Sequence, residues 1–193
     1  MPRRLRPHRS TRPLMRIVAG RFGGRRLQAP AGRATRPTSD RVREALFSTL
    51  GPLEGAAVLD LFAGSGALGL EALSRGAAQA VLVERDARAA AVARANAEAL
   101  GLGPEELRVL RMPALRALGD ARRRGATYDL VLLDPPYADA PRLGRELSDP
   151  VAAVLAPAGR VVTESDRRAP LELALPVAHE RRYGDTLIRI HTA

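Results

Sequence analysis

The sequence predicts an α/β fold of the Rossmann-like kind, in which one mostly parallel sheet is covered by helices on both faces. Three observations lead to this prediction. From Ala57 onward, short apolar runs typical of buried strands alternate with longer helical stretches. A glycine-rich loop follows the first of these runs, and an Asp-Pro-Pro-Tyr tetrapeptide follows the fourth. A chain of 193 residues with 46% hydrophobic content is long enough for one such domain and too short for two.

The first part of the chain divides at Met15, which is a second candidate start of the protein. Residues 1–14 contain three prolines and five arginines and offer no apolar face, so we expect a disordered basic tail. Residues 16–29 predict two short strands, because Phe22-Gly23-Gly24 carries the turn chemistry of a hairpin.

A helix should follow this hairpin. Thr38-Ser39-Asp40 offers N-cap side chains, and the apolar stripe behind it reaches Gly51-Pro52, where the helix should end. We therefore expect a basic hairpin and helix at residues 15–52, followed by the main domain at residues 53–193.

The main domain should contain a seven-stranded sheet. The alanine-rich stretch 87–100 is a good helix former between two of the strands. The first five strands are expected at residues 57–61, 80–84, 107–111, 128–133 and 159–164. Two further strand-like runs, 177–183 and 186–191, are separated by Gly184-Asp185, so they predict an antiparallel hairpin at the edge of the sheet.

The positive charge is concentrated at one end of the chain. Residues 1–46 carry 13 arginines and two acidic residues, a net charge of +11, whereas the remaining 18 arginines and 19 acidic residues sum to −1. The chain has no lysine, and guanidinium groups suit bidentate contact with phosphate and stacking on bases. We therefore expect a nucleic acid partner, with a merely solvated basic tail as the alternative for the residues before Met15.

The composition also excludes several classes of protein. The chain has no cysteine, which excludes disulfides, zinc-thiolate sites and cysteine nucleophiles. The scattered histidines His8, His179 and His191 do not have the spacing of a metal site, so we expect no metal. No apolar run approaches the roughly 20 residues of a membrane span, and the N-terminus lacks the apolar core of a secretory signal. A cytoplasmic protein without membrane contact is expected, with a monomer as the default.

The glycine loop at residues 63–69, AGSGALG, matches the G-x-G-x-x-G pattern between a strand and a helix. Alone, this pattern indicates a dinucleotide. However, Asp60 would place a carboxylate near a pyrophosphate, whereas the α-ammonium of S-adenosylmethionine favours such a partner. Glu84 closes the second strand, where an acidic side chain can accept hydrogen bonds from ribose hydroxyls, but both cofactors carry that ribose.

The tetrapeptide Asp134-Pro135-Pro136-Tyr137 follows the fourth strand and should lie beside the glycine loop, because the carboxyl ends of parallel strands form the ligand crevice. The lone pair of an exocyclic base amine is delocalised into the ring, so the nitrogen becomes nucleophilic only when acceptors bind its hydrogens. Asp134 and the carbonyl of Pro135 can be these acceptors, held in place by the two prolines. Tyr137 can stack on an extruded base.

These segments together resemble the bacterial 16S ribosomal RNA guanine-N2 methyltransferases of the RsmD type, which are class I S-adenosylmethionine-dependent enzymes. The resemblance covers residues 15–191 and includes DLFAGSGALG, VERD, DPPY and YGDT. The glycine loop and DPPY are shared by many amino-methyltransferases. The more specific part is MRIVAGRFGGRRL together with TRPTSDRVREALF, in front of the catalytic domain.

The resemblance implies that S-adenosylmethionine is the cofactor and that the substrate is a guanine of 16S rRNA in partly assembled small ribosomal subunits. It places Asp134, Pro135 and Tyr137 at the base as catalytic residues. The expected cofactor contacts are Asp60, Ala63, Gly64, Ser65, Gly66, Glu84, Arg85 and Ala114. The arginines expected to bind RNA are Arg21, Arg25, Arg26, Arg36 and Arg41. After the third strand, many such enzymes have an acidic residue at the adenine amine. This chain has Arg111-Met112-Pro113-Ala114, so backbone groups or apolar packing should replace that contact.

Three alternatives remain open at this point. The methylated amine could be adenine N6, cytosine N4 or a protein glutamine. The chain could be a non-catalytic RNA-binding assembly factor on the same fold, since fold does not imply activity. A nicotinamide oxidoreductase is a third alternative, opposed by Asp60.

Overall fold

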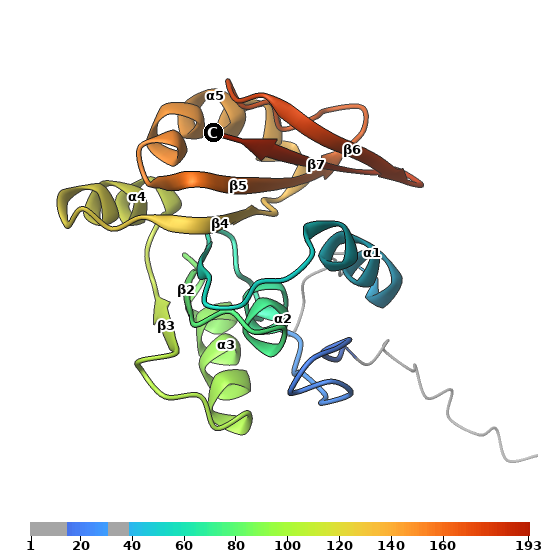
Figure 1. The fold of residues 1–193 in the computed structure, drawn as a ribbon, viewed down its shortest axis with the longest axis vertical. Helices are drawn as coiled ribbons and strands as arrows, with labels where there is room; N and C mark the ends of the chain where they lie inside the picture. The colour runs from blue at the N-terminus through green and yellow to red at the C-terminus, as the bar shows by residue number, and fades with distance from the viewer. Residues whose placement is uncertain (1–14, 31–38) are drawn as a thin grey trace, which may run out of the picture.

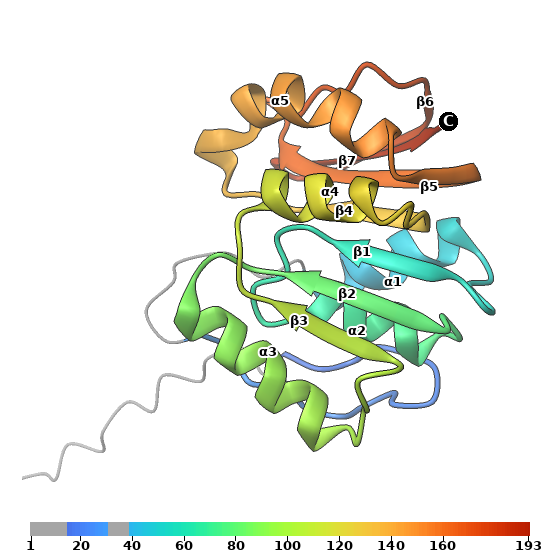
Figure 2. The same ribbon diagram turned by 90° about the vertical axis from the view of Figure 1, so that its left-hand side faces the viewer.

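The computed structural model describes residues 15–30 and 39–193. It shows one seven-stranded sheet with the strand order β3-β2-β1-β4-β5-β7-β6 (Figures 1 and 2). The strands are β1 (Ala57–Asp60), β2 (Gln79–Val83), β3 (Leu107–Leu110), β4 (Tyr128–Leu133), β5 (Leu155–Asp166), β6 (Val177–Tyr183) and β7 (Thr186–Thr192). The first five are parallel, and β7 and β6 complete the sheet as antiparallel strands. The predicted α/β fold with its C-terminal hairpin is confirmed.

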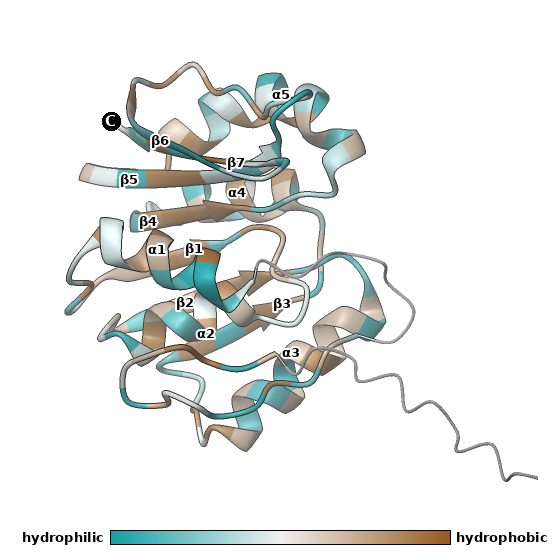
Figure 3. Ribbon diagram, turned by 90° about the vertical axis from the view of Figure 1, so that its right-hand side faces the viewer, coloured by the Kyte–Doolittle hydropathy of each residue, from teal (hydrophilic) through white to brown (hydrophobic). Residues whose placement is uncertain are grey.

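Helices cover both faces of this sheet. They are α1 (Asp40–Leu50), α2 (Ala67–Ser74), α3 (Ala87–Ala99), α4 (Ala114–Arg123) and α5 (Ala140–Ala152), with a short 3-10 helix η1 (Tyr137–Asp139) before α5. One apolar cluster joins α1, α2 and α3 to the sheet, and a second joins α4 and α5 to it. Figure 3 shows the apolar character of β1, β2 and β4 between these helices, whereas β6 at the edge of the sheet is largely hydrophilic. Burial on both faces explains why the strands read as continuous apolar runs.

The strands lie close to their predicted positions, with one clear difference. Strand β5 begins at Leu155, four residues before the expected start at residue 159. Leu155 pairs with Tyr128, and a register shift follows before the regular pairing of Leu130 with Arg160. Ala158 has a φ of 61° in this irregular part. The early pairing could not be predicted because the LAPAG sequence does not have the pattern of a strand.

The predicted hairpin at residues 16–29 has no regular strands. Its two arms are nevertheless paired antiparallel around a bridge between Arg16 and Arg26, so the hairpin is confirmed in a short form. The N–H groups of Leu27, Ile17 and Gly24 donate to the carbonyl oxygens of Met15, Arg25 and Ile17, at 2.8 to 2.9 Å. Helix α2 binds two further backbone donors of this segment. The N–H groups of Val18 and Ala19 donate to the carboxylate of Glu71, at 2.7 and 3.1 Å. This segment is therefore held against α2 by a buried side chain.

The predicted N-cap of α1 is confirmed. The hydroxyl of Ser39 accepts a hydrogen bond from the N–H of Val42, and the helix ends at Gly51. The expected tail at residues 1–14 and the predicted RNA-binding residue Arg36 lie outside the described residues. Within residues 15–30 and 39–193, no helix combines the length and apolar character needed to cross a membrane.

Candidate active site

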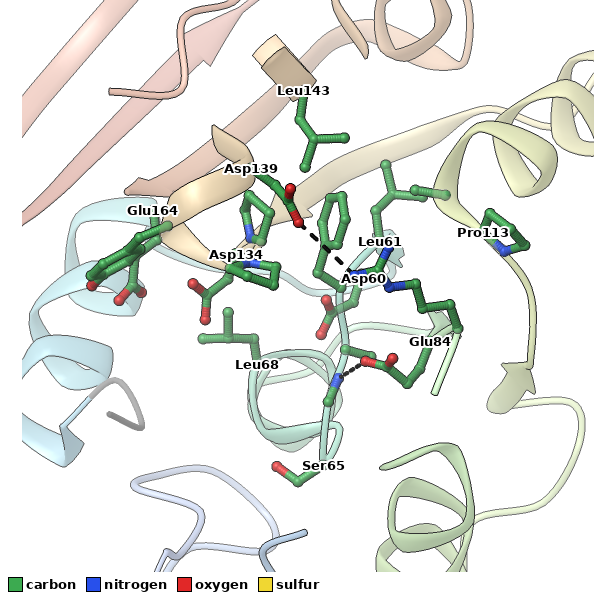
Figure 4. Close-up of a pocket in the computed structure, with 18 of the residues that line it drawn as sticks. Asp60, Leu61, Ser65, Leu68, Glu84, Pro113, Asp134, Asp139, Leu143 and Glu164 are labelled. Carbon is green, nitrogen blue, oxygen red and sulfur yellow. Dashed lines mark hydrogen bonds and ion pairs between the residues drawn. The ribbon is translucent and has the colours of Figure 1, made fainter. Parts of the chain in front are cut away.

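A pocket of about 960 Å³ lies at the carboxyl ends of the parallel strands. Strands β1 and β4 are neighbours in the sheet although β2 and β3 separate them along the chain. Successive strands are therefore added on one side of β1 up to β3 and on its other side from β4 onward. Open α/β sheets form their ligand crevice at the point where this order switches. The walls come from the glycine loop, the ends of β2, β3 and β5, and the segment after β4 (Figure 4). The structure thus brings the two predicted motifs into one cavity.

Asp60, the last residue of β1, supplies a buried carboxylate to this pocket. Its side chain is 1% exposed. The Oδ2 atom accepts a hydrogen bond of 3.2 Å from the N–H of Gly69, whereas the Oδ1 atom has no hydrogen-bond partner in the described structure. Burial raises the pKa of Asp60 to about 7, and the charge of Glu84 adds to the rise, although N–H groups of Gly69 and Phe62 act in the opposite direction. The pocket therefore contains an acceptor that suits a cationic ligand group.

Glu84 connects the end of β2 to the glycine loop. Its Oε2 atom accepts a hydrogen bond of 2.9 Å from the N–H of Gly64, and its Oε1 atom accepts one of 2.7 Å from the N–H of Asp86. Each carboxylate oxygen retains a second lone pair for further hydrogen bonds. The side chain is thus held in one orientation at the pocket wall.

The last two glycines of the loop permit close packing of α2 on the sheet. A Cβ atom at Gly66 would lie 2.9 Å from the side chain of Leu82, and one at Gly69 would lie 2.3 Å from it. Gly66 also has a φ of 85°, which favours glycine. These glycines therefore leave room for the Leu82 side chain of β2 beneath α2.

Asp134 lies in the same cavity, directly after β4. Burial raises its pKa well above the ordinary value, and the charges of Glu164 and Asp60 raise it further. Pro135 and Pro136 follow it in the wall of the pocket. The hydroxyl of Tyr137 forms a hydrogen bond of 3.1 Å with the hydroxyl of Thr186. This bond anchors the aromatic ring at the pocket to strand β7.

The wall after β3 is largely apolar. Met112, Pro113, Ala114 and Leu115 line it, and Leu115 is 44% exposed. Arg85, which follows β2, also lines the pocket, and its Nη2 atom lies 3.9 Å from Oδ2 of Asp139. Figure 4 marks this ion pair with a dashed line at Asp139. Apolar packing is therefore available where the sequence lacks an acidic residue.

Comparisons with known proteins identify the family. The family described as "Conserved hypothetical protein 95" matches residues 15–192. The chain belongs to this family. The Bacillus subtilis protein YlbH, named provisionally as an rRNA methyltransferase, is 38% identical over 181 residues, which cover 92% of this chain and 98% of YlbH. Ribosomal RNA small subunit methyltransferase D of Escherichia coli strain K12 is 42% identical over 133 residues, which cover 68% of this chain and 65% of that relative.

Solved structures agree with this assignment. The Escherichia coli protein yhhF superposes with a TM-score of 0.78 at 35% sequence identity, covering 93% of this chain and 97% of that chain. The resemblance drawn from the motifs is confirmed. The fold of this family member is that of the class I methyltransferases.

Two charged side chains of the pocket were not expected from the sequence. Arg43 on α1 is 1% exposed, and Glu164 on β5 is 4% exposed. The Nη2 atom of Arg43 donates to the carbonyl oxygen of Arg16 at 2.7 Å and to Asp40 at 2.6 Å. Its Nε and Nη1 atoms are buried without a hydrogen-bond partner in the described part of the chain. Arg41, which the sequence favoured instead, is exposed two residues earlier.

The arginines predicted to bind RNA are not gathered at the pocket. Arg21 forms an ion pair of 2.5 Å with Glu106, just before β3, and Arg25 donates to the carbonyl oxygen of Ala99 at the end of α3. Both contacts lie toward the amino ends of the strands, opposite the pocket. Arg26 and Arg41 are exposed. The structure therefore separates these four arginines, and their contact with RNA stays a prediction.

Proposed function

We propose that this protein transfers a methyl group from S-adenosylmethionine to the N2 amine of a guanine in 16S rRNA. The observation that carries this proposal is the position of Asp60 and Asp134 at the carboxyl ends of the neighbouring strands β1 and β4, where both line one cavity. One carboxylate suits the cofactor and the other suits the amine. The similarity to the Escherichia coli protein, a small subunit rRNA methyltransferase, supports the class of substrate.

The residues of the pocket fit the cofactor. The unpartnered Oδ1 atom of Asp60 can accept from its α-ammonium, and the unpartnered N–H groups of Arg43 can donate to its carboxylate. Glu84 can accept from the ribose hydroxyls while the Gly64 N–H holds it in place. Ala63, Gly64, Ser65 and Gly66 would border the cofactor, with Arg85 and Ala114 at the adenine end. When bound, S-adenosylmethionine would supply a methyl group attached to a positively charged sulfonium sulfur. Loss of the methyl group leaves that sulfur as a neutral thioether.

Asp134, Pro135 and Tyr137 would serve the base. Asp134 and the carbonyl oxygen of Pro135 accept hydrogen bonds from the two hydrogens of the guanine N2 amine. These bonds localise the lone pair on N2 instead of in the ring, so N2 becomes nucleophilic. Asp134 then receives the proton that N2 releases. Tyr137, held by Thr186, stacks on the extruded base and excludes water from it. No covalent enzyme intermediate is needed.

The RNA would be bound by guanidinium groups around the opening. Arg26 and Arg41 are the best placed of the described candidates, because they are exposed and lie on the segments that flank the pocket residues Ala29 and Arg43. The substrate is proposed to be the partly assembled small subunit, bound by a monomer of this protein.

The alternatives predict different products. A methyltransferase for adenine N6, cytosine N4 or glutamine would use the same Asp60 and Asp134, so only the product distinguishes it. A non-catalytic assembly factor would bind RNA without turnover.

The proposal is tested by transfer of labelled methyl from S-adenosylmethionine to small subunits and to naked 16S rRNA, both from cells that lack the protein. Nucleoside analysis should detect N2-methylguanosine. Label on another base or on protein would overturn the guanine assignment, and cofactor binding without transfer would overturn the enzymatic one. The Asp134→Ala variant serves as the inactive control.

A further inference from the structure

Glu164 is a buried carboxylate that the proposed mechanism does not use. It lies on β5, next to β4 in the sheet, where Leu133 pairs with Thr163 in register. The following residues of these parallel strands, Asp134 and Glu164, are therefore neighbours across the two strands. Glu164 is 4% exposed and lines the pocket. Figure 4 shows its carboxylate pointing into the same side of the cavity as that of Asp134.

Electrostatic coupling supports this proximity. After burial, the charge of Glu164 is the largest contribution to the raised pKa of Asp134, and it also raises the pKa of Tyr137. Glu164 is therefore close to both residues that are proposed to contact the base.

The backbone of Glu164 is fixed on both sides. Strand β5 lies between β4 and β7, and Glu164 is in register with Ile188 of β7. A side chain on a central strand of a sheet is held more accurately than one on a loop. The carboxylate of Glu164 is therefore presented to the pocket from a fixed backbone position.

Two adjacent carboxylates match one base edge better than the others. Guanine presents two neighbouring donors, the ring N1–H and the exocyclic N2 amine. Adenine and cytosine present a ring nitrogen acceptor beside their exocyclic amine. A carboxylate is an acceptor only, so it repels such a ring nitrogen unless it takes up a proton. A buried polar site rejects a ligand that leaves its groups unpaired.

We propose that Glu164 is a specificity-determining residue that accepts a hydrogen bond from N1–H of the target guanine while Asp134 accepts from N2. This inference rests on the proposed function, because it assigns the base of the same site. The arrangement selects guanine against adenine and cytosine before any methyl group is transferred.

The test compares guanine with 2-aminopurine, which keeps the exocyclic amine but has an acceptor at N1. The wild-type protein first identifies its target guanine in small subunits. That nucleotide is then replaced by 2-aminopurine in 16S rRNA ligated from synthetic and transcribed pieces, and the subunits are reconstituted. We expect kcat/KM of the wild type to fall by about 100-fold or more on this substrate.

The Glu164→Gln variant should lose most of this preference, because its Nε2 can donate to N1 of 2-aminopurine while its Oε1 can still accept from N1–H of guanine. Its kcat/KM on 2-aminopurine should therefore exceed that of the wild type, whereas on guanine it should fall only as far as a neutral acceptor is weaker than a charged one. The affinity for S-adenosylmethionine, measured by calorimetry, should change by less than about threefold. Glu98→Gln, on the exposed face of α3, is the matched control and should behave as the wild type.

Each outcome separates the inference from the proposed function. An unchanged guanine to 2-aminopurine ratio in Glu164→Gln, with N2-methylguanosine still formed by the wild type, overturns the role of Glu164 alone. Absence of N2-methylguanosine with the wild type overturns both. If Glu164→Gln does not fold, the wild-type comparison remains decisive, since equal rates on the two bases would also overturn the inference.

Discussion

Binding of S-adenosylmethionine should weaken as the pH falls, because Asp60 must lose its proton to pair with the α-ammonium. The pKa of Asp60 is raised from 3.8 to about 7 by burial, so the carboxyl is largely protonated below neutral pH. Cofactor binding then has to release one proton. The dissociation constant should increase by about 20-fold as the pH falls from about 7.5 to about 5.5. At pH values above the pKa of Asp60 it should become nearly independent of pH. Above about pH 8 the cofactor amine itself loses its proton, so the window ends below that pH. Asp134 in the same pocket also has a raised pKa, so the contribution of Asp60 is read from comparison with a variant that lacks its carboxyl.

Calorimetry in two buffers of different ionisation enthalpy measures both the affinity and the proton release. The matched variant is Asp60→Asn, which keeps an acceptor for the Gly69 N–H and has no titratable group. Its affinity should be lower than that of the wild type above about pH 7 and should change little across the same window. An affinity of the wild type that stays constant between these pH values would refute the pairing of Asp60 with the cofactor.

Three other predictions follow from single contacts. Asp134→Ala should lower kcat by about 100-fold or more and leave the cofactor dissociation constant within about threefold in single-turnover and binding assays; equal turnover would contradict its role at the amine. Gly20→Ala should lower the free energy of unfolding by about 3 kcal/mol in denaturant titrations, because its Cβ would lie 1.8 Å from a backbone oxygen at the end of α2. Gly24→Ala, with a similar φ of 82° and no atom within 4 Å, should cost only about 1 kcal/mol, and equal losses would count against the steric explanation. Replacing Arg26 and Arg41 by glutamine should flatten the salt dependence of RNA binding by about 1.5 logarithmic units per decade, and an unchanged slope would exclude them from the interface.

The fold was predictable because its main signals are local. Alternating apolar runs and helical stretches determine a parallel sheet, and the handedness of strand–helix–strand connections leaves few topologies. The hairpin at residues 16–29 was predicted from its turn, but its attachment to α2 was not, because Glu71, which binds the N–H groups of Val18 and Ala19, is more than 50 positions away. Turn residues indicate where the chain reverses, but they do not indicate which side chains elsewhere in the protein bind the backbone N–H groups.

The predictable part of the site consists of residues at strand ends. Asp60, Glu84 and Asp134 follow or close apolar strands, and the strand order of the fold brings such positions together. Their burial and charge interactions come from the assembled sheet, so the raised pKa of Asp60 could not be read from the sequence.

Arg43 and Glu164 show why the rest of the site was missed. Arg43 lies in a stretch with several arginines, and only its position on the buried side of α1 distinguishes it from its exposed neighbour Arg41. The helical period was a usable signal, because Arg43 lies three and four residues before Leu46 and Phe47 on the same face. Glu164 lies two residues before the end of β5, and Glu84 directly follows β2. An acidic residue at the carboxyl-terminal part of a buried strand should therefore itself be treated as a site residue. Applied to every strand of the sheet, that rule would have added Glu164 to the acidic residues already expected at the strand ends. The choice between guanine and the other bases would then have been a question about the carboxylates of Asp134 and Glu164.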